Sequence, residues 1–142
     1  QYNLGFMYRK GHGVPQDYKA AVKWWTKAAE QGLTFAQYNL GQIYRRGDGV
    51  PQDYKTALKW YKKAVEQGDA DAQYNLGVMY NKGHGVPQDF VYAHMWLDLA
   101  VSSGYKNAVK NRDIVAQVMS SSQIEKAQDL ARECVKKKYK GC

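Results

Sequence analysis

The chain has 142 residues, of which 44% are hydrophobic, so it is long enough to bury the core of one globular domain. The sequence contains no run of about 18 apolar residues, which excludes a helix that spans a bilayer. Lysine and arginine number 21 against 13 acidic residues, and the resulting net charge of +8 keeps nucleic acid or another anionic polymer among the partners to be considered.

The sequence repeats with a period of 36 residues, since Gln1, Gln37 and Gln73 each begin the letters QYNLG. A period in this range is typical of arrays in which each unit buries its apolar face only by stacking on its neighbours. The first copy starts inside the pattern, so we expect an upstream segment. The predicted division is three repeats at 1–36, 37–72 and 73–104, the first truncated at its start, and C-terminal capping helices at 105–142.

Each repeat is predicted to be a pair of helices. In the second copy, Ala36, Leu40 and Tyr44 recur at helical spacing, which predicts a first helix, helix A, over residues 34–46. Apolar residues at i, i+3, i+4, i+7 and i+8 predict a second helix, helix B, over about 54–67.

The loop GDGVPQD between the two helices is interpreted as a turn and not as a ligand site. Its glycines permit unusual backbone angles, its proline fixes φ, and Asp53 stands where a helix N-cap is expected. Gly68 is expected to end helix B in the left-handed conformation. Inside helix A, Gly41 and its equivalents Gly5 and Gly77 lower helix propensity, which predicts a close approach of helices A and B.

The pattern decays after Gly104 into a predicted cap. Ser122 and Glu125 fit a capping box at the start of a last helix, and the lysine-rich end of that helix, 136–140, is expected to be frayed and solvated. On one continuous helix Cys134 and Cys142 would lie about 12 Å apart, so they remain free unless the chain folds back after Tyr139. A bridge would imply an oxidising compartment.

The repeated letters resemble the Sel1-like repeat. They run Ala-x-x-Tyr-x-Leu-Gly-x-x-Tyr, then Gly-x-Gly-Val-x-x-Asp, then Ala-x-x-Trp-x-x-x-Ala and Gly, and the match covers residues 1–104. The resemblance implies an all-α fold, a right-handed α-solenoid (superhelix) of antiparallel helix pairs similar to tetratricopeptide repeats. It also implies a scaffold or adaptor, and it favours a protein of the bacterial envelope (periplasmic) or a secreted one.

Identical polar residues recur on helix A beside variable ones. If helix A lines the concave surface, as in tetratricopeptide-like folds, the amides would hold a peptide backbone and the basic residues would face acidic side chains. The alternative is that each asparagine bonds the neighbouring repeat. The candidate peptide-binding residues are Asn3, Phe6, Lys10, Asn39, Gln42, Arg46, Asn75, Val78 and Lys82.

No catalytic residue, cofactor or metal is expected. His12, Asp48 and His84 share one loop position, but stacked repeats lie about 10 Å apart, too far for side chains to converge on a metal ion. Ser103 and Lys106 match the Ser-x-x-Lys spacing of penicillin-recognising enzymes, but Gly104 breaks the helical turn that this chemistry needs.

The sequence therefore favours a non-catalytic scaffold that binds a protein or an extended peptide on the surface of helix A. The alternative is a basic solenoid that binds nucleic acid or another anionic polymer, with affinity that falls steeply as salt rises. Self-association through helix A of the first copy is a further alternative, because that copy presents a truncated end.

Overall fold

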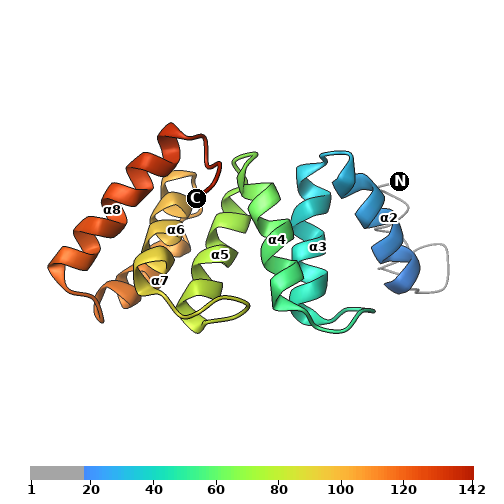
Figure 1. Cartoon of the computed structure of the whole chain (residues 1–142), viewed down its shortest axis with the longest axis horizontal. Coiled ribbons are helices and arrows are strands. Elements are labelled where there is room, and N and C mark those ends of the chain that lie inside the picture. Colours follow the sequence, from blue (N-terminus) through green and yellow to red (C-terminus); the bar gives the residue numbers. More distant parts are fainter. Residues whose placement is uncertain (1–17) are drawn as a thin grey trace. The chain divides into compact units, whose positions relative to one another are not determined.

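We analysed a computed structural model that describes residues 18–142. Those residues form seven α-helices and no strand (Figure 1). The helices are α2 (Tyr18–Glu30), α3 (Thr34–Arg46), α4 (Tyr54–Val65), α5 (Ala70–Lys82), α6 (Phe90–Ser102), α7 (Ala108–Ala116) and α8 (Ser121–Lys136). The chain divides into two compact units, unit 1 at residues 1–64 and unit 2 at residues 65–142. None of the helices in 18–142 is long and apolar enough to cross a membrane.

In unit 1 the helices lie close to their predicted positions. Helix α3 has the predicted bounds, and Ala36 and Leu40 on its apolar face are fully buried against α2. Helix α4 begins as predicted but ends at Val65, two residues before the predicted end. The Gly68 N–H donates to the Val65 carbonyl at 2.8 Å in a tight turn, and Gly68 itself has a φ of 85°, which directs the chain out of the helix.

Aspartate caps begin α4 and α6, the two helices whose preceding Gly-x-Gly loop lies within the described residues. The Asp53 carboxylate accepts from the Thr56 N–H at 3.1 Å and from the Thr56 hydroxyl at 2.7 Å, as predicted. These hydrogen bonds favour the charged carboxylate, so they lower the pKa of Asp53. In the next copy, Asp89 accepts from the Tyr92 N–H at 3.1 Å. The loops therefore turn the chain and start a helix, as the sequence indicated.

Glycine in helix A allows helix B to approach closely, which confirms the prediction for two copies. A Cβ atom at Gly41 would lie 2.5 Å from the ring of Tyr61, and one at Gly77 would lie 2.7 Å from Cγ of Leu97. Real Cβ atoms do not come so near another heavy atom. Gly5, the third member of the set, lies outside the described residues.

Unit 2 is organised around α6. This helix packs against α5, α7 and α8, and most of its side chains are buried, so it forms the centre of the unit (Figure 1). Its buried Ala93, Leu97 and Ala100 join Ala108 and Val115 of α7 in one apolar cluster. Helix α7 is thus part of the core of unit 2.

The last helix begins two residues before the predicted start, so the predicted capping box at Ser122 and Glu125 is wrong. The N-cap is Ser120, whose hydroxyl accepts from the Gln123 N–H at 3.1 Å, while the Gln123 side chain accepts from the Ser120 N–H at 2.9 Å. Three successive serines offer several capping registers. Met119 packs against the core of unit 2, which places the start of the helix directly after it.

The C-terminal segment is folded back and bridged, not frayed. Helix α8 ends at Lys136, and Lys138 and Tyr139 take positive φ angles of 54° and 65°. The Tyr139 N–H donates to the Cys134 carbonyl at 2.9 Å, and Cys134 forms a disulfide with Cys142 across a Cα–Cα distance of 5.8 Å. The reversal that a bridge requires is therefore present, one residue earlier than the sequence suggested.

Candidate functional site

The asparagines of the predicted ladder take one conformation in both units. The side-chain nitrogen of Asn39 donates to the Phe35 carbonyl at 2.7 Å, and that of Asn75 donates to the Asp71 carbonyl at 2.8 Å. Each amide nitrogen bonds one turn back in its own helix, so these bonds are not the inter-repeat bonds of the alternative reading. An asparagine amide has a second N–H and an acceptor oxygen beyond this bond. Asn3 lies outside the described residues, as do Phe6 and Lys10.

In unit 1 a polar network surrounds Gln42, another of the predicted residues. Its side-chain oxygen accepts from the Tyr61 hydroxyl at 2.7 Å and from Nε of Arg45 at 3.0 Å. Its side-chain nitrogen donates to the Tyr38 hydroxyl at 2.7 Å. The network joins α3 to α4, and the ring of Tyr61 that donates to Gln42 lies directly against Gly41.

The phenol of Tyr61 is held neutral in this network. Burial disfavours the phenolate and raises the pKa of Tyr61 to about 12, although the nearby Arg45 acts in the opposite direction. The tyrosine therefore remains a hydrogen-bond donor to Gln42 throughout the physiological pH range. Arg46, the next predicted residue on α3, is exposed.

In unit 2 a hollow of about 220 Å³ lies beside the positions that correspond to this network. Val78 replaces Gln42 and Leu97 replaces Tyr61 in the third copy, so the hydroxyl and amide that meet in unit 1 are missing there. The lining residues come from three helices, and they are Tyr74, Val78, Asn81, Lys82, Leu97, Asn111 and Ile114. Two of the predicted residues, Val78 and Lys82, are among them.

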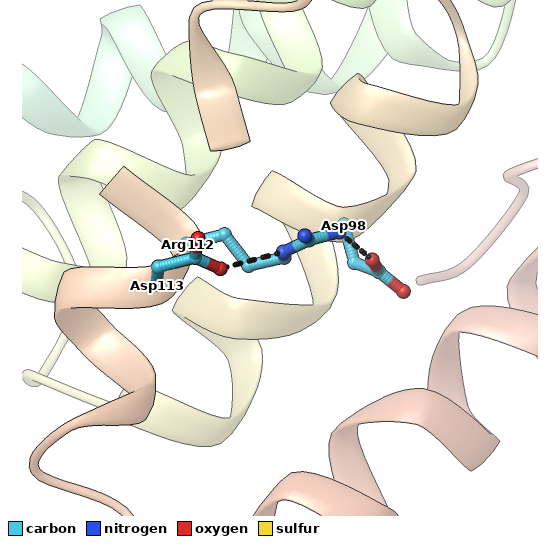
Figure 2. Close-up of polar contacts among 3 residues, drawn as sticks. All are labelled: Asp98, Arg112 and Asp113. Atoms are coloured by element: carbon cyan, nitrogen blue, oxygen red, sulfur yellow. Dashed lines mark hydrogen bonds and ion pairs between the residues drawn. The ribbon is translucent and has the colours of Figure 1, made fainter. Parts of the chain in front are cut away.

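Helix α7 forms one wall of the hollow and is held by polar contacts. The Asn111 side chain donates to the Tyr74 hydroxyl at 2.7 Å, which ties α7 to α5. Arg112 lies between two carboxylates, with Nη1 2.8 Å from Asp98 of α6 and Nε 3.4 Å from Asp113 of its own helix (Figure 2). These contacts fix the distance of α7 from the other two walls.

A wider and shallower depression continues along the outer face of α7. Its volume is about 710 Å³, and it shares Ile114 with the hollow. Val109 and Ile114 are 37% and 49% exposed here, and Lys106 and Lys110 line the same depression. The surface around the hollow is thus apolar with a basic edge.

The predicted residues within the described part of the chain lie on two helices, one in each unit. The structure places Asn39, Gln42 and Arg46 on α3 of unit 1, and Asn75, Val78 and Lys82 on α5 of unit 2. The partner positions on helix B were missed, although the exact repeat showed that Tyr61 becomes Leu97 where Gln42 becomes Val78. The wall on α7 was also missed, because the repeat pattern is lost after Gly104 and gives no register there.

The Sel1 repeat matches residues 1–33, 34–69 and 70–105, which together make up most of the sequence. The chain belongs to the Sel1 repeat family. Among curated proteins none matches the sequence. This Sel1 repeat chain is similar to the crystal structure of a Sel1 repeat protein from Oxalobacter formigenes, with a TM-score of 0.79 and 28% identity over 97% of this chain and 64% of that one.

A second solved structure similar to this Sel1 repeat chain is c5321, described as a protective antigen present in uropathogenic Escherichia coli strains and displaying an SLR fold. Its TM-score is 0.71 at 28% identity, over 97% of this chain and 38% of that one. The chain thus spans less than two thirds of either structure's length. The expected all-α repeat fold, an α-solenoid, is confirmed.

Proposed function

We propose that this Sel1 repeat protein is a non-catalytic scaffold that binds a protein or an extended peptide on the exposed face of its helix-A elements, α3 and α5. The family is one of interaction scaffolds, which supports the general role. The observation that carries the proposal is the shared conformation of Asn39 and Asn75, which present one side-chain amide per repeat at partly exposed positions.

Such amides suit an extended peptide chemically. A peptide backbone offers alternating N–H and C=O groups, and an asparagine side chain can donate to one and accept from the other. Arg46 and Lys82 lie seven residues after the asparagines, two turns further along α3 and α5, and both are exposed. They provide positive charge for acidic side chains of the partner.

Site-specific photo-crosslinking tests the proposal. A photo-reactive residue at position 46 or 82 should capture a partner from a lysate of the source organism. The same residue at position 62, which replaces exposed Lys62 of α4, should not. Capture from position 62 alone would move the binding surface to another face.

The asparagines are tested in the same assay with an Asn39→Ala/Asn75→Ala variant. Alanine is the better helix former, by up to about 0.7 kcal/mol per residue, so this variant should unfold at no lower temperature than the wild type. We expect it to lose capture at positions 46 and 82. A large drop in melting temperature would show instead that the asparagines are structural.

The alternative of an anionic polymer rests on the net charge of +8. It predicts binding to single-stranded or double-stranded nucleic acid that weakens steeply as salt rises and is lost when Arg45, Arg46 and Lys82 are replaced together. Arg45 is engaged with Gln42, so two of these three charges are exposed for such contacts. Binding that is unaffected by the triple replacement would remove this alternative.

A further inference from the structure

The two units differ in what occupies one equivalent space. In unit 1, Gln42 and Tyr61 meet through a 2.7 Å hydrogen bond above Gly41. In unit 2 the equivalent residues are Val78 and Leu97 above Gly77, and the hollow lies beside them. Each glycine faces the equivalent helix-B residue, Tyr61 for Gly41 and Leu97 for Gly77. The two units therefore differ in the side chains at this contact, and in unit 2 helix α7 adds a further wall to the hollow.

The hollow has the size and chemistry for a single side chain with its flanking backbone. Its volume of about 220 Å³ is below the range of roughly 300–1,000 Å³ typical of sites for drug-sized ligands. Val78, Leu97 and Ile114 give it apolar walls for an aliphatic side chain, while Asn81 and Asn111 give polar walls that suit the peptide backbone beside it. A short aliphatic side chain satisfies these walls without burying an unpaired polar group.

The charges near the hollow favour an acidic neighbour sequence. Lys82 lines the hollow, and Lys106 and Lys110 line the adjoining depression, all three exposed. Asp113 lines the depression and shares Arg112 with Asp98, so the three lysines and Arg112 outnumber these two carboxylates. The surroundings of the hollow are thus positive, which attracts carboxylates and repels lysines.

We propose that this hollow of unit 2 is a specificity pocket that takes one aliphatic side chain of an extended acidic peptide segment. The side chain enters between Val78, Leu97 and Ile114, and the lysines bind the carboxylates on either side of it. This inference rests on the proposed function, because it names the partner segment that the α5 face accepts.

The test uses an acetylated and amidated pentapeptide, Asp-Glu-Leu-Glu-Asp, titrated into isotopically labelled protein and followed by NMR. We expect shift changes in the backbone amides of α5 and α7. Each buried methylene changes affinity about fourfold, so alanine in place of the peptide's leucine should weaken binding about tenfold or more. A Lys-Lys-Leu-Lys-Lys peptide should bind more weakly than the alanine peptide, because its lysines are repelled by the lysines around the hollow.

The decisive variant carries the unit 1 pair in unit 2, as Val78→Gln/Leu97→Tyr. The glycine contact accommodates tyrosine in unit 1, so the same exchange should fill the hollow and abolish the preference for leucine. If this variant melts early, Val78→Gln alone at a partly exposed position serves the same purpose. For the charges, Lys82→Gln should weaken binding, whereas Lys126→Gln, an exposed lysine of α8, should not.

Three results would each refute the proposed specificity pocket. They are equal binding of the leucine and alanine peptides, shift changes confined to other helices, and no shift changes at millimolar peptide. These results leave the proposed function separately measurable. If positions 46 and 82 crosslink to a partner but the leucine and alanine peptides bind equally, the helix-A surface binds a partner and the hollow does not select it. Loss of both means that the helix-A face is not the binding surface.

Discussion

Replacing Gly77 by alanine adds one methyl group at the contact between α5 and α6. The new Cβ would lie 2.7 Å from Cγ and 2.9 Å from Cδ2 of Leu97, and 3.2 Å from the carbonyl oxygen of Ala93. Leu97 is 1% exposed, so the new methyl group would overlap a packed side chain. The helices must separate or Leu97 must leave its rotamer.

Two opposing effects determine how much Gly77→Ala changes the free energy of unfolding. Overpacking a buried contact costs about 1–3 kcal/mol, while glycine to alanine inside a helix contributes about 1 kcal/mol of stability. We therefore expect Gly77→Ala to lower the free energy of unfolding by up to about 2 kcal/mol. In a Leu97→Ala background, Cγ and Cδ2 of Leu97 are absent. There, Gly77→Ala should raise the free energy of unfolding by up to about 1 kcal/mol. The sign of the effect should reverse between the two backgrounds.

A double-mutant cycle measures this reversal. Urea unfolding followed by circular dichroism gives the free energies, and native-state hydrogen exchange of the α6 amides reports unit 2 by itself. The coupling between positions 77 and 97 should be on the order of 1–3 kcal/mol. Stabilisation by Gly77→Ala of equal size in both backgrounds would refute the steric reasoning.

Three further measurements test other contacts. Burial raises the pKa of Tyr61 from 10.0 to about 12, so between these pH values the folded state holds a proton that the unfolded state loses. The free energy of unfolding should therefore fall by up to about 3 kcal/mol between pH 10 and 12. In alkaline unfolding curves, Tyr61→Phe should make that fall shallower. Reduction of the Cys134–Cys142 bridge with dithiothreitol should lower the free energy of unfolding by about 2–3 kcal/mol, measured by thermal unfolding. The Cys142→Ala variant has no bridge, so dithiothreitol should not change its stability. Asp89→Ala should lower the free energy of unfolding by about 1 kcal/mol, because α6 loses its N-cap. Asp89→Asn should lower it much less, because the asparagine side chain can still accept from the Tyr92 N–H.

The repeat itself made most of the fold predictable. Helical spacing, the N-cap at Asp53 and the glycine at position 68 are local signals, and each appears in the structure where it was expected. The errors occurred where a local signal had more than one solution. Three adjacent serines allowed two capping registers, and the packing of Met119 decided between them.

The candidate site was less predictable, because it depends on contacts between helices. Helix-A positions such as Val78 and Lys82 follow from the repeat, and both line the hollow. The contribution of Asn111 and Ile114 depends on how α7 packs after the repeat pattern has ended, which no periodicity encodes. The bridge between Cys134 and Cys142 likewise depends on two left-handed residues that the sequence does not mark with glycine.

The glycine contacts have a consequence for how such an array can diversify. Gly41 faces the aromatic ring of Tyr61, whereas Gly77 faces the aliphatic side chain of Leu97. The same glycine position thus accepts an aromatic or an aliphatic neighbour on helix B. A longer array built on this 36-residue period can therefore vary the side chains at this contact from copy to copy.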